Sequence, residues 1–279
     1  YVTVATGAMD QVAAAVAVGN THSGIVSEMT GTCLVVAATC KSSFGERWRP
    51  FYVYCHALKG KHLAICCSQT AGIIYKWFRD EFCGDLLQKG KNGFVQMDRL
   101  AASEPPLSNG VILFPHFTGM QVPISDPFVR GVFFGVGLNT GRASFLRAIM
   151  EGVGYMLQEN IELLQQLGIS VEKIFSSGGG AKSTLWNQIK ADITGIQVFT
   201  LDSSEETALL GAAILGSVAC KIHPDIETAL AAIHLEQKSY NPDEERVRLY
   251  KNGYKRYRMM YERFSDIFHT DEIAYEYER

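Results

Sequence analysis

The chain has 279 residues, of which 47% are hydrophobic and 20% are charged, and its formal net charge is −3. This is the composition of an ordinary globular protein, and the length allows one large domain or two small ones. The charge provides no basic surface for nucleic acid or an anionic membrane, and no apolar run approaches the roughly 20 residues of a membrane span. We therefore expect neither a nucleic-acid nor a membrane partner.

Seven cysteines are scattered along the chain, and none of them forms a C-x-x-C pair. An odd number at irregular spacing favours reduced thiols, and with them a cytoplasmic protein, over a disulfide framework or a metal site. The chain opens on Tyr1-Val2-Thr3-Val4, without an initiator methionine or a basic leader. We interpret this opening as that of a fragment cut at the start of a strand.

The first elements are predicted to be a strand, a turn and a helix. Residues 2–5 are short and β-branched, which predicts a buried strand, and the alanine-rich residues 12–18 predict a helix. Asp10 lies at the junction between the two. It could serve simply as the helix N-cap. The alternative is a carboxylate held at the mouth of a cleft.

Strands joined by short loops are predicted next, over residues 24–30, 33–39, 51–57 and 62–68. This order favours an antiparallel region of a sheet. The first two strands meet at Thr30-Gly31-Thr32, a hairpin tip with two hydroxyls and a glycine. Such a tip can present N–H and O–H donors to phosphate oxygens. The simpler interpretation is a turn with threonines on its flanking strands.

The middle of the chain is predicted to be mainly helical. Helices are expected over residues 71–82 and 94–103, and the apolar stripe of Ile74, Trp77 and Phe78 is more typical of core than of a cofactor site. A strand over residues 111–114 leads into an irregular loop that contains His116, which we interpret as structural. A long helix over residues 139–167 has one apolar face.

A glycine-rich segment, Ser176-Ser177-Gly178-Gly179-Gly180-Ala181-Lys182-Ser183, lies between a predicted strand at 171–175 and a predicted helix at 185–194. Glycines allow unusual backbone angles and leave the main chain open to a flat ligand, while the helix N-terminus offers free N–H groups. The spacing matches neither the Walker nor the Rossmann pattern. A tightly packed turn is therefore the alternative to a nucleotide site.

The last third continues as strand and helix. A strand is predicted at 197–201, and Ser203-Ser204-Glu205-Glu206 has the capping-box pattern that opens a helix over 207–219. Further helices are expected over 226–235 and 242–268. Strands first, followed by alternating strands and helices, predict a single α/β domain.

Taken together, these motifs resemble the second, C-terminal domain of the FGGY family of carbohydrate kinases. The resemblance covers essentially the whole chain in the family's order. The segments that carry it are residues 7–14, the turn at 29–32, the loop through 113–131, Phe134-Gly135 followed by Arg147-Ala148 with Glu151-Gly152, the glycine turn with Trp186, Gln188, Ala191 and Asp192, and Glu206-Thr207-Ala208 with Gly211-Ala212-Ala213.

The resemblance implies an α/β fold of the actin-like or ribonuclease-H-like ATPase type, a mixed sheet flanked by helices. It implies that residues 1–279 are the nucleotide-binding half of an ATP-dependent sugar kinase, xylulokinase-like or gluconokinase-like, whose N-terminal domain lies outside this chain. The isolated chain is then expected to fold but to be inactive. Whether it forms a homodimer is left open.

The resemblance also implies roles for individual residues. Asp10 would be the general base that takes the proton of the sugar hydroxyl, and Asp10 and Gln11 would contact the sugar. Magnesium would sit on the phosphates of ATP, with no metal site made by this chain alone. The residues implied for ATP are Thr30, Gly31, Thr32, Gly178, Gly179, Gly180, Lys182 and Ser183.

One departure from the family and two alternatives remain. Where many members have Gly-Glu-Arg in the substrate-side loop, this chain has Gly119-Met120-Gln121 and so lacks two charges. A nucleotide-switch protein of the actin or Hsp70 class would need the phosphate turns but no base such as Asp10. An activator ATPase with an iron–sulfur cluster is disfavoured, because C-x-x-C pairs are missing.

Overall fold

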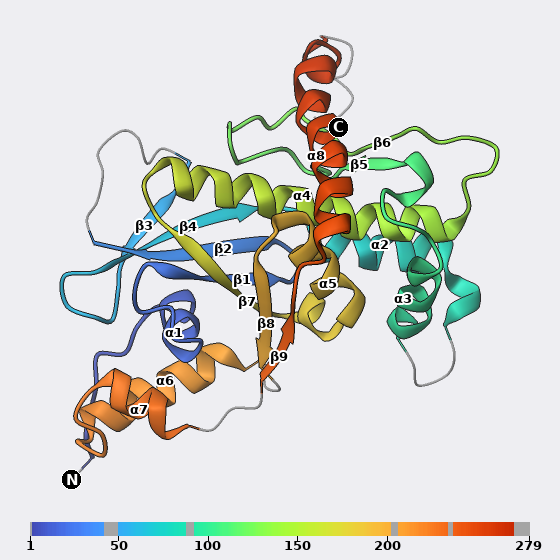
Figure 1. Cartoon of the computed structure of the whole chain (residues 1–279). Coiled ribbons are helices and arrows are strands. Elements are labelled where there is room, and N and C mark those ends of the chain that lie inside the picture. The colour runs from blue at the N-terminus through green and yellow to red at the C-terminus, as the bar shows by residue number, and fades with distance from the viewer. Residues whose placement is uncertain (1, 42–49, 88–91, 202–205, 234–236, 271–279) are drawn as a thin grey trace.

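A computed structural model describes residues 2–41, 50–87, 92–201, 206–233 and 237–270. Within these ranges, seven strands form a mixed sheet in the order β3-β4-β2-β1-β7-β8-β9 (Figure 1). The strands of this sheet are β1 (Gly24–Thr30), β2 (Leu34–Cys40), β3 (Tyr52–Cys55), β4 (His62–Ser68), β7 (Val171–Ser177), β8 (Gln197–Leu201) and β9 (Gln237–Tyr240). A separate antiparallel pair consists of β5 (Ile112–Phe114) and β6 (Val132–Phe134).

Helices flank the sheet on both sides, with α4 across one face and α1 and α6 on the other (Figure 1). The α-helices of the described residues are α1 (Asp10–Ala17), α2 (Gly72–Phe82), α3 (Phe94–Ala102), α4 (Arg142–Gln166), α5 (Thr184–Thr194), α6 (Thr207–Ala219), α7 (Ile226–Ala232) and α8 (Glu244–Phe268). Short 3₁₀ turns in the same ranges are η2 (Gly84–Leu86), η3 (Ser108–Gly110) and η4 (Gly179–Lys182).

The two faces of the sheet are built from alternate residues of the same strands. Along β2, Leu34 and Val36 join the large core beneath α4, whereas Ala37 packs with Val12 of α1 on the opposite side. Successive side chains of a strand point to opposite faces, so a strand buried on both faces is apolar at nearly every position. The near-continuous apolar sequence of β2 follows from this placement.

The direction of the central strands positions the functional site. β1 pairs antiparallel with β2 but parallel with β7, with Met29 opposite Ser177. Parallel neighbours end at the same edge of a sheet. The hairpin tip that follows Thr30 and the glycine turn that follows Ser177 therefore lie side by side, although some 150 positions separate them in the chain.

The strand predicted at the N-terminus was wrong, and one of the two interpretations of Asp10 is excluded. Residues 2–5 form no strand, and the side chains of Val2 and Val4 are each 90% exposed. β-branched residues become a strand only where a neighbouring strand pairs with them, and the described residues supply none here. Asp10 is not the N-cap of α1, because Met9 holds that position and makes no side-chain capping bond.

Other differences are smaller. β6 and β9 were not predicted, and α4 begins at Arg142 rather than at residue 139. Trp77 is 36% exposed, unlike its buried stripe partners Ile74 and Phe78. The predicted capping box falls largely on residues 202–205, which lie outside the described residues.

His116 is structural, as expected. It is buried against Phe114, and its Nε2 lies 3.3 Å from the hydroxyl of Tyr257 on α8. Burial lowers the pKa of this imidazole to about 3. No disulfide joins any two of the seven cysteines, all of which lie in the described ranges. Nowhere in the described part of the chain is a helix both long and apolar enough to cross a membrane.

Candidate functional site

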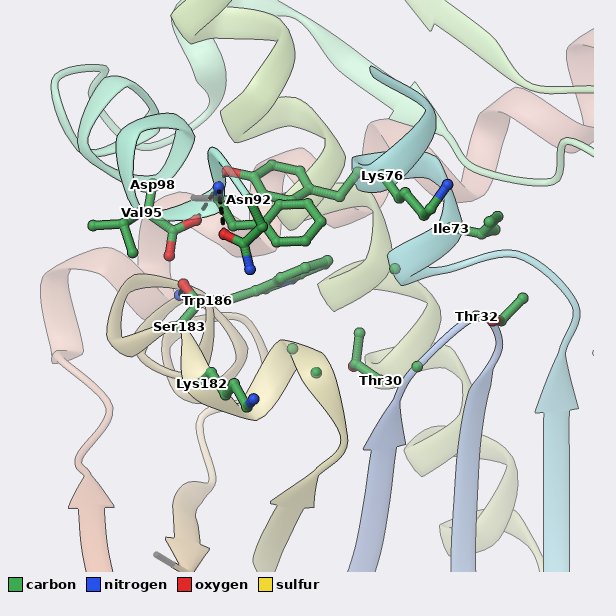
Figure 2. Close-up of a pocket in the computed structure, with 16 residues that line it drawn as sticks. Thr30, Thr32, Ile73, Lys76, Asn92, Val95, Asp98, Lys182, Ser183 and Trp186 are labelled. Carbon is green, nitrogen blue, oxygen red and sulfur yellow. Dashed lines mark hydrogen bonds between the residues drawn. The ribbon is translucent and has the colours of Figure 1, made fainter. Parts of the chain in front are cut away.

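A cavity of about 400 Å³ opens at the edge of the sheet where β1 and β7 end (Figure 2). Its volume lies in the range of small-molecule sites. The lining comes from the hairpin tip, the glycine turn and the helices α2, α3 and α5. The lining residues are Thr30, Gly31, Thr32, Gly72, Ile73, Tyr75, Lys76, Asn92, Phe94, Val95, Asp98, Gly179, Gly180, Lys182, Ser183 and Trp186.

The hairpin tip forms one side of the cavity. The N–H of Gly31 donates to the carbonyl of Cys33 at 3.0 Å and closes the turn, while the carbonyl of Thr32 accepts from Ala71 N at 2.9 Å. A Cβ at Gly72 would lie 2.4 Å from the carbonyl oxygen of Gly31, so only glycine allows α2 to begin so close to the tip. The Thr32 side chain remains exposed beside the cavity.

The three glycines after β7 have different surroundings. Gly178 has a φ of +76°, and a Cβ there would lie 2.9 Å from the carbonyl oxygen of Thr30. A Cβ on Gly180 would lie 2.7 Å from the Thr30 side chain, whereas one on Gly179 would meet no atom within 4 Å. Gly178 and Gly180 therefore pack the turn onto the hairpin. Gly179 presents its backbone to the cavity. Gly180 also lines the cavity, and Gly178 does not.

A buried ion pair lies beneath this double turn. The Nζ of Lys190 on α5 is 2.9 Å from Oε2 of Glu28 on β1, and both side chains are fully buried. Ser176 donates its hydroxyl to the same carboxylate oxygen at 2.5 Å and accepts from Lys190 at 3.0 Å. The hydroxyl of Thr30 also donates to Glu28, so this side chain is engaged inward rather than toward the cavity.

Three aromatic rings form the apolar wall. The ring centroids of Tyr75 and Trp186 are 5.3 Å apart, and those of Tyr75 and Phe94 are 5.9 Å apart. The indole of Trp186 is fixed by a hydrogen bond from Nε1 to the carbonyl of Met150 at 3.0 Å. Flat aromatic surfaces of this kind suit a planar ligand. Sequence reasoning missed this wall, because the three rings come from three helices and each resembles an ordinary core residue.

A polar group faces the same wall. Asp98 on α3 accepts a hydrogen bond from the hydroxyl of Tyr75 at 2.9 Å. Burial raises the pKa of the Asp98 carboxyl above its usual value, although the nearby hydroxyls of Ser183 and Tyr75 act to lower it. Ser183 is the N-cap of α5 and accepts from Trp186 N at 3.1 Å. Asp98 was not among the residues predicted from the sequence.

Asp10 and Gln11 lie outside this cavity, on the side of the sheet that carries α1. Asp10 is exposed, and its Oδ1 accepts from the N–H of Gln11 at 2.7 Å. Gln11 lines a second, much smaller cavity together with Met29 and Ser177, the residues that directly precede the hairpin tip and the glycine turn. The two predicted substrate residues thus lie near the same edge of the sheet as the cavity, across the ends of β1 and β7.

The remaining positions singled out in the sequence differ in exposure. Lys182 is exposed on η4 and lines the cavity. In the substrate-side loop, Met120 is buried, and the amide of Gln121 lies 3.5 Å from the hydroxyl of Tyr52. The described residues contain no group of three or more His, Cys, Asp or Glu side chains that could hold a metal ion.

Comparison with known proteins places these features in a family. Residues 30–220, more than half of the chain, match the model of the FGGY family of carbohydrate kinases, C-terminal domain. The chain is 28% identical over 260 residues to the xylulose kinase of Staphylococcus epidermidis, covering 93% of this chain and 51% of that one. It is 30% identical over 217 residues to the gluconokinase of Bacillus subtilis, covering 75% of this chain and 42% of that one.

A solved structure confirms the expected fold. The crystal structure of the xylulose kinase from Rhodospirillum rubrum matches with a TM-score of 0.83 at 24% identity, over 94% of this chain and 52% of that one. The actin-like, ribonuclease-H-like ATPase fold predicted from the sequence is thereby confirmed. The chain spans about half the length of the curated relatives it matches.

Proposed function

The chain belongs to the FGGY family of carbohydrate kinases, and from this membership we propose that residues 1–279 are the C-terminal, nucleotide-binding domain of an ATP-dependent sugar kinase. The observation that carries the proposal is the cavity at the ends of β1 and β7. It combines a hairpin tip, an open glycine backbone and a wall of three aromatic rings. A nucleotide needs one kind of surface for its phosphates and another, flat and apolar, for its base, and this cavity combines the two.

The cavity fits ATP in a definite orientation. The base lies against Tyr75, Phe94 and Trp186, and the phosphates extend toward the hairpin tip, where the exposed hydroxyl of Thr32 can donate to a phosphate oxygen. Magnesium bound to the phosphates supplies charge neutralisation of the transferring group. The backbone of Gly179 lies along the nucleoside, because no side chain stands there.

Asp10 is proposed as the general base. As the sugar hydroxyl oxygen attacks the γ-phosphorus, its proton passes to the Asp10 carboxylate, and ADP leaves. The position of Gln11 beside Met29 and Ser177 supports this role, because it brings α1 to the strand ends from which both turns emerge. A carboxylate there can approach a sugar from the face opposite the nucleotide.

We place the remaining functions of the kinase in an N-terminal domain, since the relatives are about twice as long as the match. Closure of two domains over the site would exclude water and orient the sugar. Within this proposal the protein acts in the cytoplasm, where ATP is available and cysteines without disulfides, as in this chain, are usual. The names of the relatives suggest a pentulose or a sugar acid as the phosphoryl acceptor.

The proposal is tested by comparing residues 1–279 with the whole product of the natural gene. Both are assayed for ADP release with ATP, Mg²⁺ and a panel of xylulose, gluconate and glycerol. We expect the whole product to turn over with one of these sugars at roughly 1–100 per second, and residues 1–279 to bind ATP without sugar-dependent turnover. Ordinary turnover by residues 1–279 alone would refute the division into two halves. ATP binding by the whole product with no activity on any sugar would favour a nucleotide switch.

Gly179 and Gly180 provide a matched pair of variants for the glycine turn. Gly179→Ala places a methyl group in open space, so it should leave the unfolding midpoint unchanged while weakening ATP binding by about tenfold. Gly180→Ala collides with Thr30 and should lower the free energy of unfolding by about 1–3 kcal/mol. Titration calorimetry and thermal melts separate the two effects. ATP affinity unchanged in Gly179→Ala would mean that the turn serves packing alone.

A further inference from the structure

One end of the cavity carries a carboxylate whose neighbour Tyr75 has already committed its proton. The hydroxyl of Tyr75 donates to Oδ1 of Asp98 at 2.9 Å. Ser183 lies at the same end of the cavity, and its oxygen accepts from Trp186 N at 3.1 Å. The Tyr75 proton is therefore directed at the carboxylate rather than at a ligand.

This arrangement leaves acceptors facing the cavity. An ionised carboxylate has about four lone-pair positions and no proton, so the hydrogen bond from Tyr75 leaves room for more. In Figure 2, Asp98 and Ser183 lie at one end of the Trp186 ring, and Thr30 and Thr32 lie beyond its other end. A nucleotide with its phosphates at the hairpin tip would thus bring the outer edge of its base toward Asp98.

We infer that Asp98 selects nucleotides whose base carries an amino group at this edge, by accepting a hydrogen bond from that group. The inference rests on the proposed function, which supplies the nucleotide, and adds the residue that discriminates among bases. A 6-amino purine places an N–H donor against the carboxylate. A 6-oxo purine places an acceptor there, so two acceptors face each other without a proton between them.

The hydrogen bond to Asp98 should change which base is preferred. It should not change how tightly the phosphates bind. Hydrogen bonds to a charged partner are stronger than neutral ones, and an acceptor left unpaired in a desolvated site is costly. Asn92 also lines the cavity, and its amide oxygen accepts from Phe94 N at 3.2 Å, which leaves its amide N–H groups for a ring nitrogen. The expected selectivity for ATP over ITP is about tenfold or more.

The test measures binding of ATP and ITP to the purified chain by titration calorimetry, for the wild type and two variants. Asp98→Asn keeps the shape but can turn an N–H toward an oxo group, so it should weaken ATP, strengthen ITP and bring the two within about threefold. Asp98→Ala removes the acceptor and should abolish the preference without a gain for ITP. The control is Glu244→Gln, an exposed carboxylate on α8 that should leave the ratio unchanged.

The outcomes separate the inference from the function on which it rests. A wild-type preference for ATP that collapses in both Asp98 variants, with circular dichroism confirming that they are folded, supports the inference. ATP binding with the same ATP-to-ITP ratio in wild type and variants overturns it and leaves the proposed function intact. If the wild type binds no nucleoside triphosphate, both fall together.

Discussion

Asp10→Asn in the whole kinase should lower kcat by about 10²–10⁴, because the sugar hydroxyl would then attack without a group to take its proton. Asparagine preserves the size of the side chain and can still accept from the N–H of Gln11. Asp10 is exposed and lies outside the cavity proposed for the nucleotide, so the affinity for ATP should be nearly unchanged. Steady-state kinetics with the preferred sugar and calorimetry with ATP measure the two quantities separately.

A matched control for this variant is Asp225→Asn. Asp225 is also an exposed aspartate at a helix N-terminus, where its Oδ1 accepts from Thr228 N at 2.7 Å. It lies at α7, and it lines none of the cavities described here. Its replacement should leave kcat unchanged. If Asp10→Asn turned over like the wild type, Asp10 would not be the general base.

Lys190→Met should destabilise the fold by about 3–5 kcal/mol, the largest loss of stability we expect from one substitution. The variant leaves Glu28 fully buried, with the hydroxyls of Ser176 and Thr30 as its remaining donors and no opposite charge. An uncompensated buried charge is far more costly than the loss of an exposed pair. Urea unfolding of residues 1–279, followed by circular dichroism, gives the difference in free energy.

Two further variants establish the cause. Arg248→Met breaks the exposed pair with Glu244, whose side chain is 90% exposed, and should cost no more than about 0.5 kcal/mol. The double variant Glu28→Gln/Lys190→Met removes both charges and should recover part of the loss. The burial of the Glu28–Lys190 pair indicates that it supports the two turns structurally. If Lys190→Met alone lowered the free energy of unfolding by less than about 1 kcal/mol, the pair would not have this role.

Sequence reasoning identified the elements whose signals are local. The bounds of β1, β4, β8 and α6 were predicted to the residue, because the sequence pattern that marks each of them lies within it or directly beside it. β9 was missed, since it is short and mostly exposed and becomes a strand only by pairing with β8. The strand predicted at residues 2–5 failed for the complementary reason, that nothing described pairs with it.

The residues of the candidate site also fall into those that the sequence predicts and those that it does not. The hairpin tip and the glycine turn could be predicted, because their glycines mark the chain directly. Tyr75, Phe94 and Asp98 could not, because they reach the cavity only after α2 and α3 have packed around Trp186. Nor could the inward hydrogen bond of the Thr30 hydroxyl, which depends on Glu28 being buried beneath it. The surface proposed for the phosphates was thus more visible in the sequence than the surface proposed for the base.

The most direct measurement of nucleotide binding by this domain is a crystal structure of residues 1–279 grown with ADP and Mg²⁺. We predict the adenine ring against Tyr75, Phe94 and Trp186, and the diphosphate at the turn of Gly31 and Thr32. Binding of ADP at another surface, or a cavity without ADP at concentrations that saturate the protein in solution, would contradict the assignment of this cavity as the nucleotide site.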